Sequence, residues 1–176
     1  MDLIEKELSK EVIFRGKILD LEKYHVELPN KNTSTREVVN HPGAVAILPV
    51  DDEGNIYLVK QYRFPIRKVL IEIPAGKFDS PNEDPLECGK RELAEEIGKQ
   101  ANKWIELGYI YTTPGFSNEK IYLYLAKELT EVGVNPDDDE FVEILKVTTD
   151  EMKEMIKKGE ITDSKSICAF YKYLLL

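Results

Sequence analysis

A chain of 176 residues with 42% hydrophobic content is long enough to form a core, which excludes a disordered or collagen-like protein. Its net charge of −9 argues against a general nucleic-acid surface, because such a surface needs a basic face. No apolar run approaches the roughly 20 residues that span a bilayer, and the distant cysteines Cys88 and Cys168 predict reduced thiols without a disulfide framework.

The first predicted region, residues 1–40, is a small antiparallel β-appendage. Its charged start lacks the apolar block of a secretory signal, so we expect a cytoplasmic protein. Apolar and polar residues alternate in three stretches, which predicts a meander of short strands. The stretches are 11–14, 17–28 and 35–39. The region has too few apolar positions for an independent domain, and residues 41–176 form the predicted main domain.

The main domain is predicted to mix strands and helices without regular alternation. A buried-looking run at 44–50, a turn and a return strand at 56–62 predict the start of a central sheet. A helix is predicted from Asp84-Pro85 to Gly98, since proline suits the first helical position and glycine a left-handed cap. The remaining predictions are strands at 104–111, 120–128 and 141–147 and helices at 150–158 and 164–176.

Three carboxylates are predicted to lie on one face of that first helix. Glu92, Glu95 and Glu96 are spaced i, i+3 and i+4, so they crowd a single turn. Such an oxygen-rich cluster suits a hard cation such as Mg²⁺. The alternative is a solvated face on which Arg91 pairs with Glu87 and Glu95.

The surrounding residues make the pattern specific. Gly76 is followed after six residues by Glu83, and seven residues later 91–98 reads Arg-Glu-Leu-Ala-Glu-Glu-Ile-Gly. This segment resembles the Nudix box. It departs from the box in two places, since the box has five residues between glycine and glutamate and a hydrophobic residue where Lys99 stands. A loop longer by one residue costs little entropy.

The resemblance implies a Nudix-type α/β/α sandwich around a mixed β-sheet and a Mg²⁺ cofactor, with Mn²⁺ as a substitute. The implied metal ligands are Glu92, Glu96, the Ala75 carbonyl and Glu95, which would be a direct or water-bridged partner in catalysis. The implied structural residues of the box are Gly76, Glu83, Arg91 and Gly98, with Glu83 and Arg91 as an ion pair.

Segments outside the box resemble the ADP-ribose pyrophosphatase branch of that family. They are Gln61-Tyr62-Arg63, Pro74-Ala75-Gly76, residues 113–119 and the acidic run at 137–143. In such enzymes the acidic loop supplies the general base, which implies Glu140 here, with Asp138 second. A solvated turn is the alternative for this run.

The resemblance also gives candidates for substrate binding. They are Arg36 and Arg63 for phosphate or ribose oxygens, Glu72 for ribose, and Gly115 and Ser117 for the diphosphate. Arginine suits planar bidentate contacts. The alternatives are surface arginines, an outward-pointing Glu72 and an ordinary turn at 113–115.

We therefore expect hydrolysis of ADP-ribose to AMP and ribose 5-phosphate by metal-activated water. The alternatives are another nucleoside diphosphate-linked substrate, such as NADH, another ADP-sugar or a dinucleoside polyphosphate, and a non-catalytic regulator that binds nucleotide sugars. The small-molecule substrate is the expected ligand, with no nucleic acid or membrane partner. The resemblance further implies a homodimer whose N-terminal segment crosses to the partner and helps form the adenine site.

Overall fold

The computed structural model describes residues 3–80, 82–133 and 141–176. The chain divides into two compact units. The first comprises Met1–Gly43 and Tyr111–Lys120, and the second comprises Ala44–Ile110 and Ile121–Leu176.

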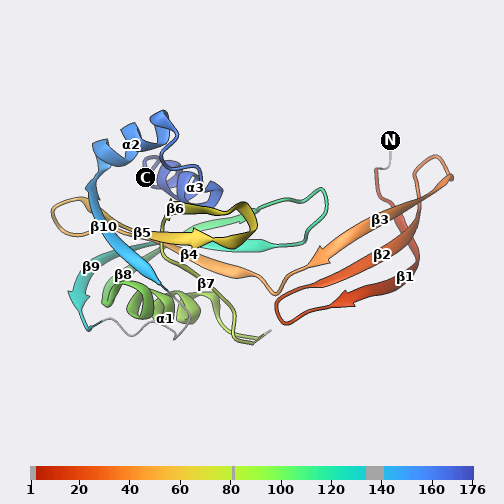
Figure 1. Ribbon diagram of the computed structural model, residues 1–176, viewed down its shortest axis with the longest axis horizontal. Helices are drawn as coiled ribbons and strands as arrows, with labels where there is room; N and C mark the ends of the chain where they lie inside the picture. Colours follow the sequence, from red (N-terminus) through yellow and green to blue (C-terminus); the bar gives the residue numbers. More distant parts are fainter. Residues whose placement is uncertain (1–2, 81, 134–140) are drawn as a thin grey trace. The chain divides into compact units, whose positions relative to one another are not determined.

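The first unit contains the predicted antiparallel meander. Its strands are β1 (Lys6–Arg15), β2 (Asp20–Glu27) and β3 (Thr33–Asn40), paired in the order β1-β2-β3 (Figure 1). The loop at 111–120 joins this unit through Val39, whose N–H donates to the Phe116 carbonyl at 2.7 Å and whose carbonyl accepts from Asn118 N–H at 3.2 Å. The sequence did not predict this pairing, because its partners are almost 80 residues apart.

The second unit contains two sheets. The strands of the first, in spatial order, are β10 (Val142–Thr148), β5 (Asn55–Arg63) and β6 (Lys68–Glu72), and those of the second are β7 (Ala75–Lys77), β4 (Ala44–Pro49), β9 (Lys120–Glu131) and β8 (Lys99–Tyr111). Strand β4 runs parallel to β9 and antiparallel to β7, so the sheet is mixed as predicted.

Strand β4 separates two hydrophobic cores. Ala46 and Leu48 face the core that contains Phe170 of helix α3, whereas Val45 and Ile47 face the core of helix α1. The helices are α1 (Pro85–Ile97), α2 (Thr149–Lys158) and α3 (Ser164–Tyr173). Figure 1 shows α2 and α3 on one side of these strands and α1 on the other. This arrangement confirms the predicted α/β/α sandwich.

Helix α1 begins and ends where its capping residues predict. The Asp84 carboxylate accepts hydrogen bonds from the Leu86 and Glu87 amides, and Gly98 ends the helix with a φ of 64°. Leu93 and Ile97 are buried against the sheet. The side of the helix that carries the carboxylates is thereby fixed relative to the strands.

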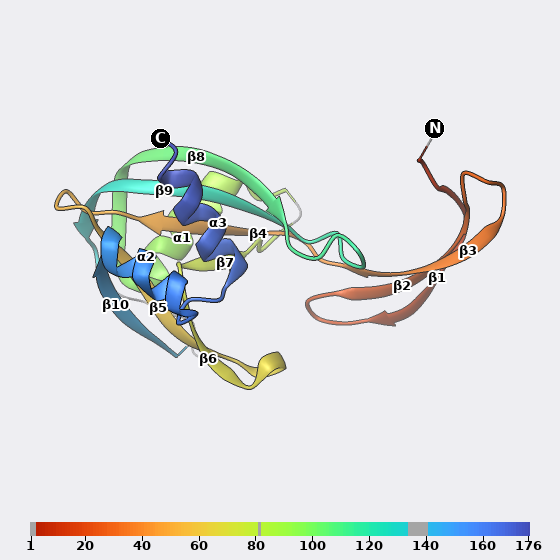
Figure 2. The same ribbon diagram turned by 90° about the horizontal axis from the view of Figure 1, so that it is seen from above.

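Two short strands, β6 and β7, were not among the elements predicted from the sequence. Strand β6 follows a single 3-10 turn, η1 (Phe64–Ile66), after which Arg67 adopts a left-handed φ of 55°. Figure 2 shows β5 and β6 as a hairpin, in yellow. Strand β7 has only three residues, too few for a visible alternation.

Both cysteines are free thiols, which confirms that no disulfide joins them. None of the helices in the described part of the chain has the length and apolar character needed to cross a bilayer.

Candidate metal and diphosphate site

The acidic face of α1 lies against the loop that begins β7. Glu92 and Glu96 are only 7% and 2% exposed, although both are carboxylates, whereas the side chain of Glu95 is 30% exposed. The Ala75 N–H donates to Glu96 Oε2 at 3.0 Å. A Cβ atom on Gly76 would lie 1.8 Å from the Glu92 carboxyl, so only glycine leaves room for this carboxylate.

Arg91 contacts several of these carboxylates at once. Its Nη1 donates to Glu92 Oε1 at 2.8 Å and to Glu95 Oε2 at 2.9 Å, and its Nε lies 3.4 Å from Glu83 Oε1. The structure therefore brings together Glu83 and Arg91 of the box. Glu87 is not a partner of Arg91 in this arrangement; it pairs with Lys90 at 2.7 Å.

The electrostatics of this cluster favour a cation. Burial lowers the pKa of Arg91, but the neighbouring carboxylates, Glu92 foremost, raise it above its ordinary value, so the guanidinium stays charged. The same guanidinium lies within 3.4 Å of carboxylate oxygens of Glu83, Glu92 and Glu95, and carboxylates gathered this closely favour a bound cation.

The donor set has the chemistry that Mg²⁺ prefers, which is hard oxygen ligands. Among the side chains that the structure describes, no three His, Cys, Asp or Glu residues converge in a ligating arrangement. Glu92 and Glu95 turn instead toward Arg91. The Glu92 carboxylate nevertheless occupies the space beside Gly76 that a Cβ atom would take, so an anionic oxygen donor is present there. The residues therefore fit a divalent cation by type and burial.

A second set of charged side chains includes Arg63, the last residue of β5, and Glu72, the last residue of β6. Arg63 donates from Nε to Glu72 Oε1 at 2.8 Å and from Nη2 to Glu72 Oε2 at 2.7 Å. Glu72 is 1% exposed, so it does not point outward. Burial raises the pKa of Glu72, but the hydrogen bond from Arg63 and the charges of Lys165 and Arg63 together hold it below its ordinary value.

Lys165 completes this second set and was missed by the sequence analysis. Its ammonium contacts Glu72 Oε2 and lies 3.1 Å from Asp163 Oδ2. The sequence carried one usable signal, because Lys165 stands four residues before Ala169, which is buried on the same helix. A lysine on a core-facing stripe requires a buried carboxylate partner.

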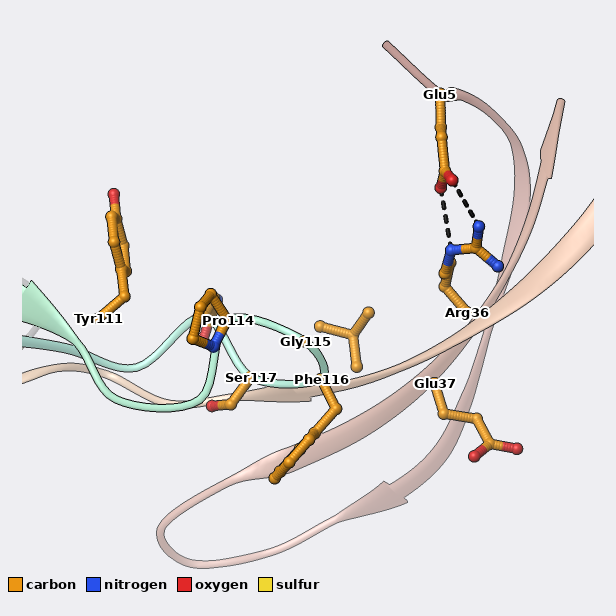
Figure 3. Close-up of a pocket in the computed structure, with 10 residues that line it drawn as sticks. Glu5, Arg36, Glu37, Tyr111, Pro114, Gly115, Phe116 and Ser117 are labelled. Carbon is orange, nitrogen blue, oxygen red and sulfur yellow. Dashed lines mark hydrogen bonds and ion pairs between the residues drawn. The ribbon is translucent and has the colours of Figure 1, made fainter. Parts of the chain in front are cut away.

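The other substrate candidates lie in the first unit, around a groove of about 470 Å³ (Figure 3). Arg36, Gly115 and Ser117 all line it, and the exposed ring of Phe116 lies beside them. A volume in the range of roughly 300–1,000 Å³ suits a small organic ligand.

The polar groups of this groove are partly committed to contacts within the unit. Arg36 Nε donates to Glu5 Oε2 at 3.0 Å, and its Nη1 donates to the Thr35 carbonyl at 2.8 Å. The Ser117 hydroxyl donates to the Val39 carbonyl at 3.1 Å, so it holds the loop in place. Gly115 has open space where a side chain would stand.

Lys99, the residue that departs from the box, is buried. Its Nζ lies 4.4 Å from the centre of the Tyr57 ring and contacts the Glu131 carboxylate. The aliphatic stem thus takes the place of a hydrophobic side chain. The candidate bases Glu140 and Asp138 lie outside the described residues.

Comparison with known proteins adds independent findings. A family model described as the NUDIX domain matches residues 40–170. The chain is 45% identical over 99% of its length to 94% of an ADP-ribose pyrophosphatase from Bacillus subtilis (strain 168). It is 44% identical over 98% of its length to 93% of a methanol dehydrogenase activator from Bacillus methanolicus. A solved structure called an ADP compounds hydrolase matches its fold with a TM-score of 0.87 and 20% identity, covering 99% of this chain and 95% of that one.

Proposed function

Because this chain belongs to the Nudix hydrolase family, we propose that it hydrolyses the diphosphate bond of ADP-ribose to give AMP and ribose 5-phosphate. The observation that carries the proposal is the pair of buried carboxylates, Glu92 and Glu96, held against the Gly76 loop. Two buried carboxylates this close together repel each other, and a bound cation offsets that repulsion. The likeness to an ADP-ribose pyrophosphatase over nearly the whole chain supports the choice of substrate.

We propose that Glu92, Glu96, Glu95 and the Ala75 carbonyl would hold Mg²⁺, or Mn²⁺ in its place. When bound, a divalent cation neutralises charge on the diphosphate oxygens and acidifies a water molecule. The protein's own part is to hold these carboxylates close together. Arg91 supports this role because its guanidinium contacts Glu92 and Glu95.

Glu140 is the proposed general base, with Asp138 as the second choice. A base in this position removes a proton from the attacking water. The support is the place of the acidic run between the box and the strand β10.

Arg63 is the proposed ligand of the diphosphate. Glu72 occupies its Nε and Nη2 atoms, and 39% of the Arg63 side chain remains exposed. Arg36, Gly115 and Ser117 are proposed to contact the rest of the nucleotide sugar. The volume and the mixed aromatic and polar lining of their groove support this assignment.

We also propose that the protein acts as a homodimer through residues 1–40. All ten residues of β1 are exposed, including Leu8, Ile13 and Phe14, and β1 is an edge strand. An exposed edge with apolar side chains is suited to pairing with a second copy of itself. A cytoplasmic location also stays a prediction.

The experiment that tests the proposed activity is incubation of the purified protein with ADP-ribose and Mg²⁺, with separation of the products. Equal amounts of AMP and ribose 5-phosphate are expected. A panel of NADH, other ADP-sugars and dinucleoside polyphosphates at the same concentration ranks the alternatives. If one of these compounds is hydrolysed faster than ADP-ribose, it becomes the proposed substrate. If the folded protein hydrolyses none of them with any of several metals, the result supports the non-catalytic regulator.

A further inference from the structure

Four charged side chains form an alternating row that crosses from β5 through β6 to α3. Arg63 binds Glu72, Glu72 binds Lys165, and Lys165 lies 3.1 Å from Asp163. Asp163 contacts Lys165 and the first turn of α3, where its Oδ2 accepts from the Ser166 amide at 3.0 Å. The row thus ties the proposed phosphate-binding arginine to helix α3, which begins 101 residues later in the chain.

The two central members of this row are buried. Lys165 is 7% exposed and Glu72 is 1% exposed. Burying such a pair gives little net stability, because desolvation offsets the attraction between the charges. An apolar pair of similar volume would serve the core as well, so stability alone does not account for a lysine here.

The geometry indicates what the lysine does. The Glu72 carboxylate binds Arg63 through two parallel hydrogen bonds, which requires one orientation of the carboxylate. The Lys165 ammonium contacts Oε2 from α3 and so fixes that orientation. Among the residues described by the structure, Glu72 accepts from Nε and Nη2 of Arg63 and no acceptor is found for Nη1, and 39% of the Arg63 side chain is exposed.

The charge of Lys165 has a second consequence. With Glu72 alone, Arg63 would form a neutral pair with weak attraction for a phosphate. Lys165 offsets part of the charge of Glu72, to an extent that Asp163 limits, so Arg63 keeps more of its attraction for an anion than it would beside Glu72 alone. Glu96 of α1 is among the groups that act on Arg63 electrostatically, which places this charge near the acidic face of the box.

We propose that Lys165 is a positioning residue for diphosphate binding: it holds Glu72 so that Arg63 presents a free, charged Nη1 group to the substrate. This inference rests on the proposed function, because it takes the diphosphate as the ligand of Arg63. Lys165 itself touches no substrate in this arrangement.

The test compares Lys165→Met with the wild type in steady-state kinetics on ADP-ribose at saturating Mg²⁺. We expect KM to rise about tenfold, the effect of one lost charge-assisted contact, with kcat changed less than about threefold. In an Arg63→Gln background, Lys165→Met should raise KM no further, because its effect passes through Arg63. Lys165→Arg, which keeps the charge, should recover part of the affinity.

Phe170→Leu is the matched control, because it weakens the packing of the same helix without touching the charged row. It should lower the Tm and leave KM unchanged. An unchanged KM in Lys165→Met would overturn the inference. So would effects of Arg63→Gln and Lys165→Met on KM that simply add in the double variant. If Lys165→Met does not fold, Lys165→Gln takes its place as the uncharged variant, and its KM is compared with that of Lys165→Arg, which keeps the charge.

The failure of the proposed function is recognised separately. A wild-type protein that leaves ADP-ribose intact rejects that function before any variant is compared. The affinity for ADP, measured by calorimetry on the same variants, then takes the place of KM. A tenfold weaker affinity in Lys165→Met would support the positioning role, and an equal affinity would reject it.

Discussion

At the residue scale, the arrangement around Gly76 depends on the absence of a side chain. The Glu92 carboxyl occupies the space where a Cβ atom would stand, 1.8 Å away. Nothing in the backbone demands glycine there, since Gly76 is not among the residues with positive φ. The glycine is therefore explained by the neighbouring carboxylate.

Gly76→Ala should accordingly displace Glu92 and impair turnover. We expect a loss of about 10–100-fold in kcat/KM, the size seen when groups that orient a metal ligand are removed. Gly89→Ala, also on α1, is the control, because its added methyl group would meet no atom of the neighbouring strands closer than 3.4 Å. Similar kinetics for the two variants would mean that Glu92 has no part in the reaction.

The proposed general base gives a prediction about pH. A glutamate base acts as the carboxylate, so kcat should fall as the pH drops through its pKa, and this acidic limb should vanish in Glu140→Gln. We expect turnover to fall by about 10²–10⁴-fold in that variant. Asp138→Asn should keep the limb. If the acidic limb vanishes in Asp138→Asn and persists in Glu140→Gln, Asp138 is the general base. If it persists in both variants, neither residue is the general base.

Residues could be assigned from the sequence where the signal was local. Glu92, Glu95 and Glu96 share a face because the helix period fixes it. Lys165 and Glu72 are 93 residues apart, and no short-range pattern joins them. The i, i+4 spacing already suggested that Arg91 pairs with Glu95, whereas its contact with the adjacent Glu92 required the structure.

At the element scale, helices with capping residues could be predicted from the sequence, whereas the shortest strands could not. The bounds of α1 follow from Asp84, Pro85 and Gly98. Strands β6 and β7 have five and three residues; β6 forms a hairpin with the neighbouring β5, whereas β7 pairs with β4, which local sequence does not reveal. The sheet beside the site was therefore only partly predictable.

The β1-β2-β3 sheet should be sensitive to acid through Glu22. Hydrogen bonds from Tyr24 and then Lys10 hold the pKa of Glu22 at about 2, below the ordinary value of 4.5. The native carboxylate binds its proton more weakly than the unfolded one. Its contribution to the free energy of unfolding is therefore complete above pH 4.5 and is lost as the pH falls toward 2.

Urea unfolding of the wild type at several pH values tests this. The wild type should lose stability between pH 4.5 and about 2 more steeply than Glu22→Gln, whose side chain does not titrate. Glu11→Gln on β1, an exposed position, is the control and should follow the wild type. Parallel curves for wild type and Glu22→Gln would contradict the assignment.

At the scale of the whole molecule, the sequence predicted a small β-appendage and a main α/β region, and the structure adds the loop at 111–120 to the first of them. That loop carries Gly115 and Ser117, two of the substrate candidates. Their union with Arg36 in one groove depends on pairing with Val39, which the sequence does not signal. The grouping of the α1 carboxylates could thus be predicted from the sequence, whereas the grouping of Arg36, Gly115 and Ser117 could not.

The proposed homodimer is tested by sedimentation velocity. We expect twice the chain mass of 20.2 kDa, and a shift toward the monomer in Ile13→Lys, which places a charge on the exposed face of β1. Lys153→Glu on the exposed side of α2 should leave the assembly unchanged. A wild type that sediments as a monomer at micromolar concentration would refute the dimer.

The most direct test of the account is uptake of Mn²⁺ by the wild type and by Glu96→Gln, followed through the electron paramagnetic resonance signal of free Mn²⁺. The amide can still accept the Ala75 hydrogen bond, so this variant removes the charge with little change in shape. We predict that the wild type binds Mn²⁺ and that Glu96→Gln binds it at least about 10–100-fold more weakly, with equal Tm values. Equal uptake by the two folded proteins would contradict the claim that the acidic face of α1 holds the metal ion.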